Sequence, residues 1–183
     1  MSIISEILQF NKAFVEKEEY KHYKASKFPT KKIAILSCMD TRLTLLLPAA
    51  LGMKNGDVKI IKNAGGVISH PYGSVIRSLL VCIYELGIEE ILVVGHYDCG
   101  MQNLQSDKIT EKMLKAGISA QAIEMVKSEI DYDKWLKGFD CVEQSVADTV
   151  KLVKHHPLIP AGIHVHGLIM DPETGRLDRV TSN

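Results

Sequence analysis

The residues best suited to chemistry lie at the ends of two apolar runs. Cys38 follows the run IAIL, and His96 and Cys99 follow the run ILVV, in the segment GHYDCGM. Two thiolates and one imidazole are ligands that suit Zn²⁺, and three protein ligands leave the fourth tetrahedral position open, as catalytic zinc sites do. The alternative for each residue taken alone is an ordinary buried side chain, because free cysteine is among the most buried residue types.

Two charged residues follow Cys38 at close spacing. Asp40 and Arg42 lie two and four positions beyond the cysteine. An arginine fork can hold a carboxylate ionised and in a fixed orientation. Such a carboxylate could accept a hydrogen bond from zinc-bound water or hydroxide, or could itself take the fourth metal position; the alternative is an exposed ion pair of little energetic value. Asp98 has a plainer explanation, as the N-cap of an expected helix.

Strands and helices that could position these residues alternate along the chain. The alternation indicates an α/β fold with a mainly parallel sheet and helices on its faces, and in such sheets ligands bind at the carboxyl ends of the strands. Cys38 and the GHYDCGM segment both lie at such ends. The turn DPETG leads into a strand that returns as an antiparallel edge. The expected strands are 33–36, 57–61, 91–94, 163–170 and 176–180, and the expected helices are 43–51, 74–86 and most of 108–154, with breaks at Gly117 and Gly138.

The N-terminal segment predicts a separate amphipathic helix. Apolar residues recur at helical spacing over 3–23, and Pro29 interrupts the pattern before the first strand. The helix could pack on its own domain or cross to a partner. Because no internal repeat or linker is visible, we expect one domain over 1–183, with residues 1–28 as a protruding helical arm. The apolar positions are Ile3, Ile7, Phe10 and Phe14.

The composition excludes several classes of partner. Hydrophobic residues make up 46% and charged residues 24% of the 183 residues, the usual globular mix. Lysine and arginine together number 22, as do aspartate and glutamate, so the formal net charge is zero. The charge balance therefore gives no indication of binding to nucleic acid or to a membrane surface. The N-terminus carries Glu6 in its apolar run and lacks the features of a signal peptide. We therefore expect a cytoplasmic protein with reduced cysteines.

Four motifs together resemble those of the β-class carbonic anhydrases: SCMDTR, NAGG, GHYDCGM and HVHGLIMDPETGRL. The similarity is closest to the compact bacterial and archaeal branch, which also includes carbon disulfide and carbonyl sulfide hydrolases. It implies one Zn²⁺ per chain on Cys38, His96 and Cys99, with Asp40 and Arg42 as a catalytic dyad. It also implies a four-stranded parallel core sheet with an added antiparallel strand, a homodimer or higher oligomer, and reversible hydration of CO₂ to bicarbonate by a zinc-bound hydroxide.

Several alternatives remain open from the sequence. COS and CS₂ are small linear molecules like CO₂ and would suit the same zinc chemistry. A non-catalytic zinc protein would result if Asp40 closed the metal site. A cysteine phosphatase is disfavoured, because its cradle needs five residues between cysteine and arginine and this chain has three between Cys38 and Arg42.

Other histidines allow further hypotheses. His70 and Tyr72, after the double glycine, could relay protons to bulk water, although an exposed loop histidine explains the same residues. His164 and His166 alternate on an expected strand and share one face, so they could bind metal, although strand histidines more often pack or face water.

Overall fold

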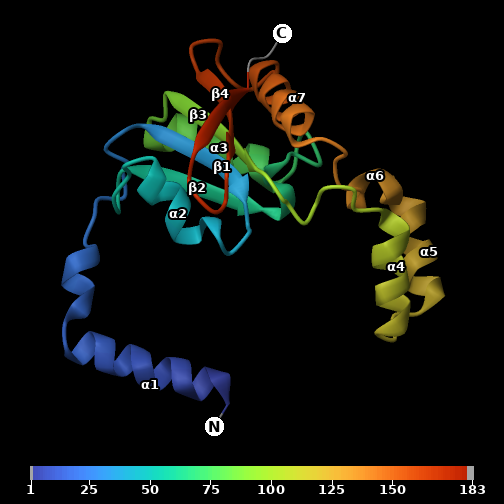
Figure 1. The fold of residues 1–183 in the computed structure, drawn as a ribbon, viewed down its shortest axis with the longest axis horizontal. Coiled ribbons are helices and arrows are strands. Elements are labelled where there is room, and N and C mark those ends of the chain that lie inside the picture. Colours follow the sequence, from blue (N-terminus) through green and yellow to red (C-terminus); the bar gives the residue numbers. More distant parts are fainter. Residues whose placement is uncertain (1, 181–183) are drawn as a thin grey trace.

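A five-stranded sheet forms the centre of the protein in a computed structural model that describes residues 2–180 (Figure 1). The strand order is β2-β1-β3-β4-β5. The first four strands are parallel, and β5 runs antiparallel to β4 along one edge. This confirms the predicted α/β fold with a four-stranded parallel core and an antiparallel edge strand. The strands are β1 (Ile33–Cys38), β2 (Val58–Asn63), β3 (Glu90–His96), β4 (His164–Met170) and β5 (Leu177–Val180).

The register of β1 and β3 decides where the chemistry can occur. These strands pair directly and in parallel, with Ser37 opposite Val94. Cys38 and His96 end their respective strands, so both lie at the carboxyl edge of the sheet. The strands are also longer than predicted from their apolar runs, because β1 continues through Ser37 to Cys38. The expected meeting of two strand ends, far apart in sequence, is therefore confirmed.

Helices cover the two faces of the sheet unequally. Helices α3 (Ser74–Leu86) and α7 (Val142–Lys154) pack their apolar side chains on one face, in a core that includes Ala34 and Val93. Helix α2 (Leu43–Ala50) packs Leu43 and Leu47 on the other face. The boundaries of α3 agree with the prediction, since Gly87 closes the helix in the left-handed conformation, with φ 69°.

Three short helices extend to one side of the sheet (Figure 1). They are α4 (Ser106–Lys115), α5 (Ala120–Glu129) and α6 (Tyr132–Leu136). The predicted breaks at Gly117 and Gly138 are correct, because both glycines lie between helices. The further break between α5 and α6 was not predicted.

The N-terminal arm is helical but is not one continuous helix. Helix α1 (Ile3–Glu16) is followed by the 3₁₀ helix η1 (Glu19–Tyr23), and Glu18 between them has φ 56°. The prediction of one helix over 3–23 is therefore wrong at its C-terminal part. Helix α1 contains no buried residue and lies apart from the sheet (Figure 1). None of the helices within residues 2–180 has the length and apolar character needed to cross a membrane.

Candidate metal centre

Three side chains with metal-binding atoms meet at the carboxyl edge of the sheet. Cys38 ends β1, His96 ends β3, and Cys99 lies in the loop that follows β3. Their ligand atoms all lie within 4.8 Å of one another, and the two sulfur atoms are 3.8 Å apart. All three residues are buried. Within the described residues 2–180, this is the only group of three such side chains close enough to share an ion.

The imidazole of His96 has the orientation of a metal ligand. Its Nδ1 lies 2.8 Å from the carbonyl oxygen of Tyr97, so Nδ1 carries the proton and donates it. Its Nε2 is buried and has no hydrogen-bond partner among the described residues. A buried polar atom without a partner is costly, and histidine ligands commonly fix their tautomer through the second nitrogen. The donor set of this site therefore fits Zn²⁺.

The two thiols contact each other, and this contact shifts their pKa values in opposite directions. A hydrogen bond from the Cys99 thiol is the main cause that lowers the pKa of Cys38 to about 4. The same contact raises the pKa of Cys99 well above its usual range. Backbone N–H groups of Asp40 and Gly65 also point to the sulfur of Cys38. A divalent cation that binds here would replace the proton held between the two sulfur atoms.

Asp40 lies beside the three ligand atoms and is held by Arg42. The guanidinium donates from Nε to Oδ1 at 3.0 Å and from Nη2 to Oδ2 at 2.8 Å, and the backbone N–H of Arg42 donates to Oδ1 at 2.9 Å. These contacts lower the pKa of Asp40 to about 2. Oδ2 of Asp40 lies 3.9 Å from Nε2 of His96. The dyad thus places an ionised carboxylate at the edge of the metal centre.

Asp98 does not cap a helix, so this prediction is wrong. The next helix in the described chain, α4, begins only at Ser106. Asp98 instead accepts two hydrogen bonds from Arg42, one at Oδ2 and one at its carbonyl oxygen, each at 2.9 Å. The available signal was its position: Asp98 lies next to Cys99, at the same sheet edge as Arg42. Sequence reasoning explained Asp98 locally and overlooked this contact between loops.

The NAGG segment packs closely against the backbone of Cys38. Gly66 has φ 65°, and a Cβ there would lie 3.0 Å from the backbone nitrogen of Cys38. The segment therefore allows the loop after β2 to approach the end of β1 closely. Lys62, just before the motif, donates from Nζ to the carbonyl oxygen of Cys38 at 2.8 Å. Lys62 was not identified from the sequence as a neighbour of Cys38.

The other histidines have explanations away from the centre. Nδ1 of His70 accepts from the backbone N–H of Tyr72, and the ring of Tyr72 lies 5.7 Å from that of the buried His156. The proton relay through His70 and Tyr72 stays a prediction. His166 pairs with Glu90 at 2.7 Å. His164 and His166 belong to no three-residue metal group among residues 2–180, so the structure gives no support to metal binding there.

Comparisons with known proteins agree with this geometry. The family model described as carbonic anhydrase matches residues 33–177. The chain is 54% identical over 183 residues to "Putative carbonic anhydrase YtiB" of Bacillus subtilis, covering 100% of this chain and 98% of that protein. It is 31% identical to a carbon disulfide hydrolase of Acidithiobacillus thiooxidans, covering 80% of this chain and 76% of the relative. The crystal structure of β-carbonic anhydrase isoform I from Trichomonas vaginalis matches with a TM-score of 0.90 and 39% identity, over 98% of each chain.

Proposed function

The chain belongs to the β-class carbonic anhydrase family, and we propose that it catalyses the reversible hydration of carbon dioxide to bicarbonate with zinc held by Cys38, His96 and Cys99. One observation supports this proposal most strongly. The buried Nε2 of His96 has no partner within residues 2–180 and shares a small volume with two thiols. An ionised carboxylate lies 3.9 Å from that nitrogen. The side chains that could hold zinc thus lie next to a carboxylate that could accept a hydrogen bond from water.

Each residue has a role in this proposal. Cys38, Cys99 and His96 would hold the ion, and bound zinc would supply a Lewis acid that lowers the pKa of a water molecule from about 15.7 toward about 7. The protein holds the imidazole in the required tautomer through the carbonyl oxygen of Tyr97. The backbone N–H groups directed at Cys38 stabilise its thiolate form.

Asp40 orients the reacting water. With a pKa of about 2, its carboxylate is an acceptor only and remains so at neutral pH. Arg42 occupies the outer side of the carboxylate, and Oδ2 faces His96. A hydrogen bond from the water to this oxygen would direct a lone pair of the water toward the carbon of CO₂. The gain is one of orientation, which contributes to rate when the reacting atoms are held in line.

The preferred substrate is tested by a direct comparison. COS and CS₂ remain candidates, because a similar protein is named as a carbon disulfide hydrolase. Stopped-flow assays of one zinc-loaded preparation with CO₂, COS and CS₂ would give the three values of kcat/KM. We expect CO₂ to be turned over fastest. Faster turnover of CS₂ or COS would replace the proposal with a hydrolase, and no turnover of any of the three would favour a non-catalytic zinc protein.

A further inference from the structure

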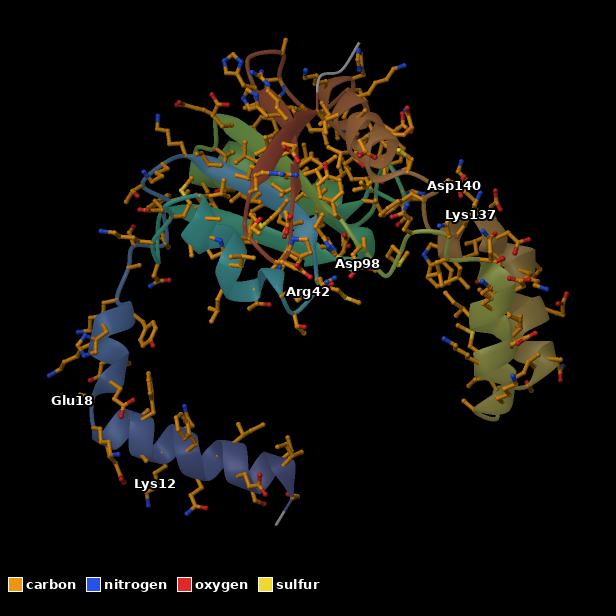
Figure 2. All side chains as sticks on the ribbon, in the orientation of Figure 1. Lys12, Glu18, Arg42, Asp98, Lys137 and Asp140 are labelled. Carbon is orange, nitrogen blue, oxygen red and sulfur yellow. The ribbon has the colours of Figure 1, made fainter. Side chains whose placement is uncertain are left out.

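Arg42 is held from two sides, and only one side belongs to the dyad. On the inner side its Nε and Nη2 donate to the carboxylate of Asp40. On the outer side Asp98 accepts from Nη1 at its carboxylate and from Nη2 at its carbonyl oxygen, both at 2.9 Å. Figure 2 shows Arg42 and Asp98 next to each other at this edge of the molecule. The guanidinium thus joins the loop after β1 to the loop after β3.

The backbone at Asp98 is unusual. Asp98 has φ 53°, in the left-handed region that residues other than glycine seldom adopt and that aspartate tolerates better than most. It lies between His96, the last residue of β3, and Cys99, so this turn joins two of the three metal-binding side chains. Both acceptors of Asp98, one on the backbone and one on the side chain, meet the same guanidinium.

We propose that Asp98 is a positioning residue, which fixes the guanidinium of Arg42 from the second loop and thereby fixes the carboxylate of Asp40 beside the metal centre. The inference rests on the proposed function for the role of Asp40. It would couple the geometry of the dyad to the turn that joins His96, at the end of β3, to Cys99. The binding of the ion and the orientation of the acceptor would then depend on one connected set of contacts.

The exposure of the pair argues for positioning rather than for stability. The side chain of Asp98 is 85% exposed and that of Arg42 is 38% exposed. Exposed ion pairs contribute little to folding, so loss of the carboxylate should hardly change thermal stability. Orientation is a different matter. The fork between Arg42 and Asp40 fixes these two groups relative to each other, but the pair can still swing as a unit. The contacts to Asp98 tie the pair to the loop after β3.

Two substitutions separate the side chain from the backbone. Asp98→Gly removes the carboxylate and suits the left-handed conformation, so it adds no strain. Asp98→Asn also tolerates this conformation and keeps an oxygen that can accept from Nη1, so it serves as the conservative rescue. Asn103→Gly is the matched control, because Asn103 is another left-handed residue, with φ 59°, in the same connecting segment.

The first measurement is the kcat/KM of the zinc-loaded proteins for CO₂. For Asp98→Gly we expect roughly a tenfold loss, smaller than the roughly 100-fold that a misplacement of about 1 Å can cost. Asp98→Asn should recover to within about twofold of the unsubstituted protein, and Asn103→Gly should match it. Zinc content and melting temperature should be the same in all four. A loss of zinc or of folding in Asp98→Gly that Asp98→Asn shares would show a structural role and overturn the inference.

The second measurement does not depend on turnover. Cobalt(II) in place of zinc gives a visible spectrum that reports the ligands and their geometry. Since Oδ2 of Asp40 is 3.9 Å from Nε2 of His96, a carboxylate whose position is no longer fixed through Arg42 and Asp98 lies close enough to disturb that spectrum. We expect the Asp98→Gly spectrum to differ from that of the unsubstituted protein. The difference should vanish when both also carry Asp40→Asn.

The outcomes separate this inference from the proposed function. A spectrum unchanged by Asp98→Gly, or a change that persists with Asp40→Asn, would show that Asp98 does not act through Asp40. If the unsubstituted protein hydrates no CO₂ but the spectral difference follows the expected pattern, the proposed function fails while the positioning role stands.

Discussion

At the scale of single residues, Asp40 is the group whose removal should affect rate without affecting the metal. Asp40→Asn keeps the size of the side chain but replaces an ionised acceptor with an amide. We expect zinc to be retained and kcat/KM for CO₂ to fall roughly 100-fold, the size of loss that misplacement of a reacting group can cause. Metal analysis and stopped-flow kinetics on the same sample would check this.

Asp140→Asn is the matched control for that substitution. Asp140 lies in an exposed ion pair with Lys137, away from the sheet edge (Figure 2). This variant should have the activity of the unsubstituted protein. Full activity in Asp40→Asn would remove Asp40 from the mechanism, and a loss of zinc in Asp40→Asn would make it a ligand instead.

The pH dependence should report the metal centre and not Asp40. Two thiolates neutralise the formal charge of Zn²⁺, so the pKa of a coordinated water should lie above the value of about 7 reached with three neutral histidines. We expect kcat/KM to be low near about pH 6.5 and to rise through roughly pH 7.5–8.5. A flat profile between about pH 6 and 9.5, or a maximum on the acid side, would contradict this assignment.

The ionisation of Asp40 should instead affect the stability of the fold at acid pH. Its pKa of about 2 in the folded protein lies below the value of about 3.9 expected for an unfolded chain. The Asp40–Arg42 pair therefore contributes stability that is fully present above about pH 3.9 and is lost as pH falls toward about 2. Because Asp40 is ionised throughout the range of the activity profile, it adds no inflection there.

The residue scale also shows what the sequence could predict about the site. Cys38, His96 and Cys99 could be selected because their residue types and their places after apolar runs are visible in the chain. The structure brings these three side chains together. Asp98 was misjudged, because its partner Arg42 lies 56 positions away and only the pairing of β1 with β3 brings the two together.

At the scale of elements, the close approach of the NAGG loop to β1 gives a sharp test. Gly66→Ala places a side chain in a left-handed conformation, which costs roughly 1–2 kcal/mol, and also forces its Cβ toward the backbone of Cys38. Gly87→Ala is the control, since Gly87 has φ 69° and nothing within 4 Å of a built Cβ. We expect Gly66→Ala to lower both melting temperature and zinc affinity, and Gly87→Ala to lower melting temperature alone. Equal zinc affinity in the two variants would show that this approach does not shape the centre.

Elements with clear local signals were predicted well. The end of α3 at Gly87 is marked in the sequence by a glycine directly after an apolar helical pattern. The break at Glu18 has no such signal, because glutamate seldom adopts φ 56° and the arm turns where Phe14 and Tyr23 bring their rings to 6.1 Å. This ring contact forms only when the chain folds back on itself, and the spacing of apolar residues along a helix does not predict such a turn.

At the scale of the whole molecule, the N-terminal arm predicts an oligomer. Helix α1 exposes an apolar stripe, with Ile7 54% and Phe10 72% exposed, and buries no residue of its own. A partner chain would cover such a stripe. We expect the full chain to sediment as a dimer or larger at micromolar concentration. That residues 1–183 form a single domain with residues 1–28 as its arm stays a prediction.

Substitutions in the arm would test this assembly. Phe10→Asp places a charge in the stripe and should shift the sedimentation toward monomer. Lys12, on the same helix, is exposed, and its Nζ lies 3.8 Å from Oε1 of Glu16 (Figure 2). Lys12→Ala should therefore leave the sedimentation unchanged. A monomeric full chain, or a Phe10→Asp variant that still assembles, would exclude the arm as the interface.

Titration of the metal-free protein with zinc tests the central claim most directly. The protein is stripped with a chelator, and the rate of CO₂ hydration is followed by stopped flow at about pH 8.5, where the expected profile is high. We predict no turnover without zinc, a linear rise with added zinc, and saturation at one ion per chain. Cys99→Ser, treated in parallel, should neither hold the ion tightly nor recover activity. Full zinc loading of the unsubstituted chain without CO₂ hydration, or turnover that is independent of zinc, would contradict the account.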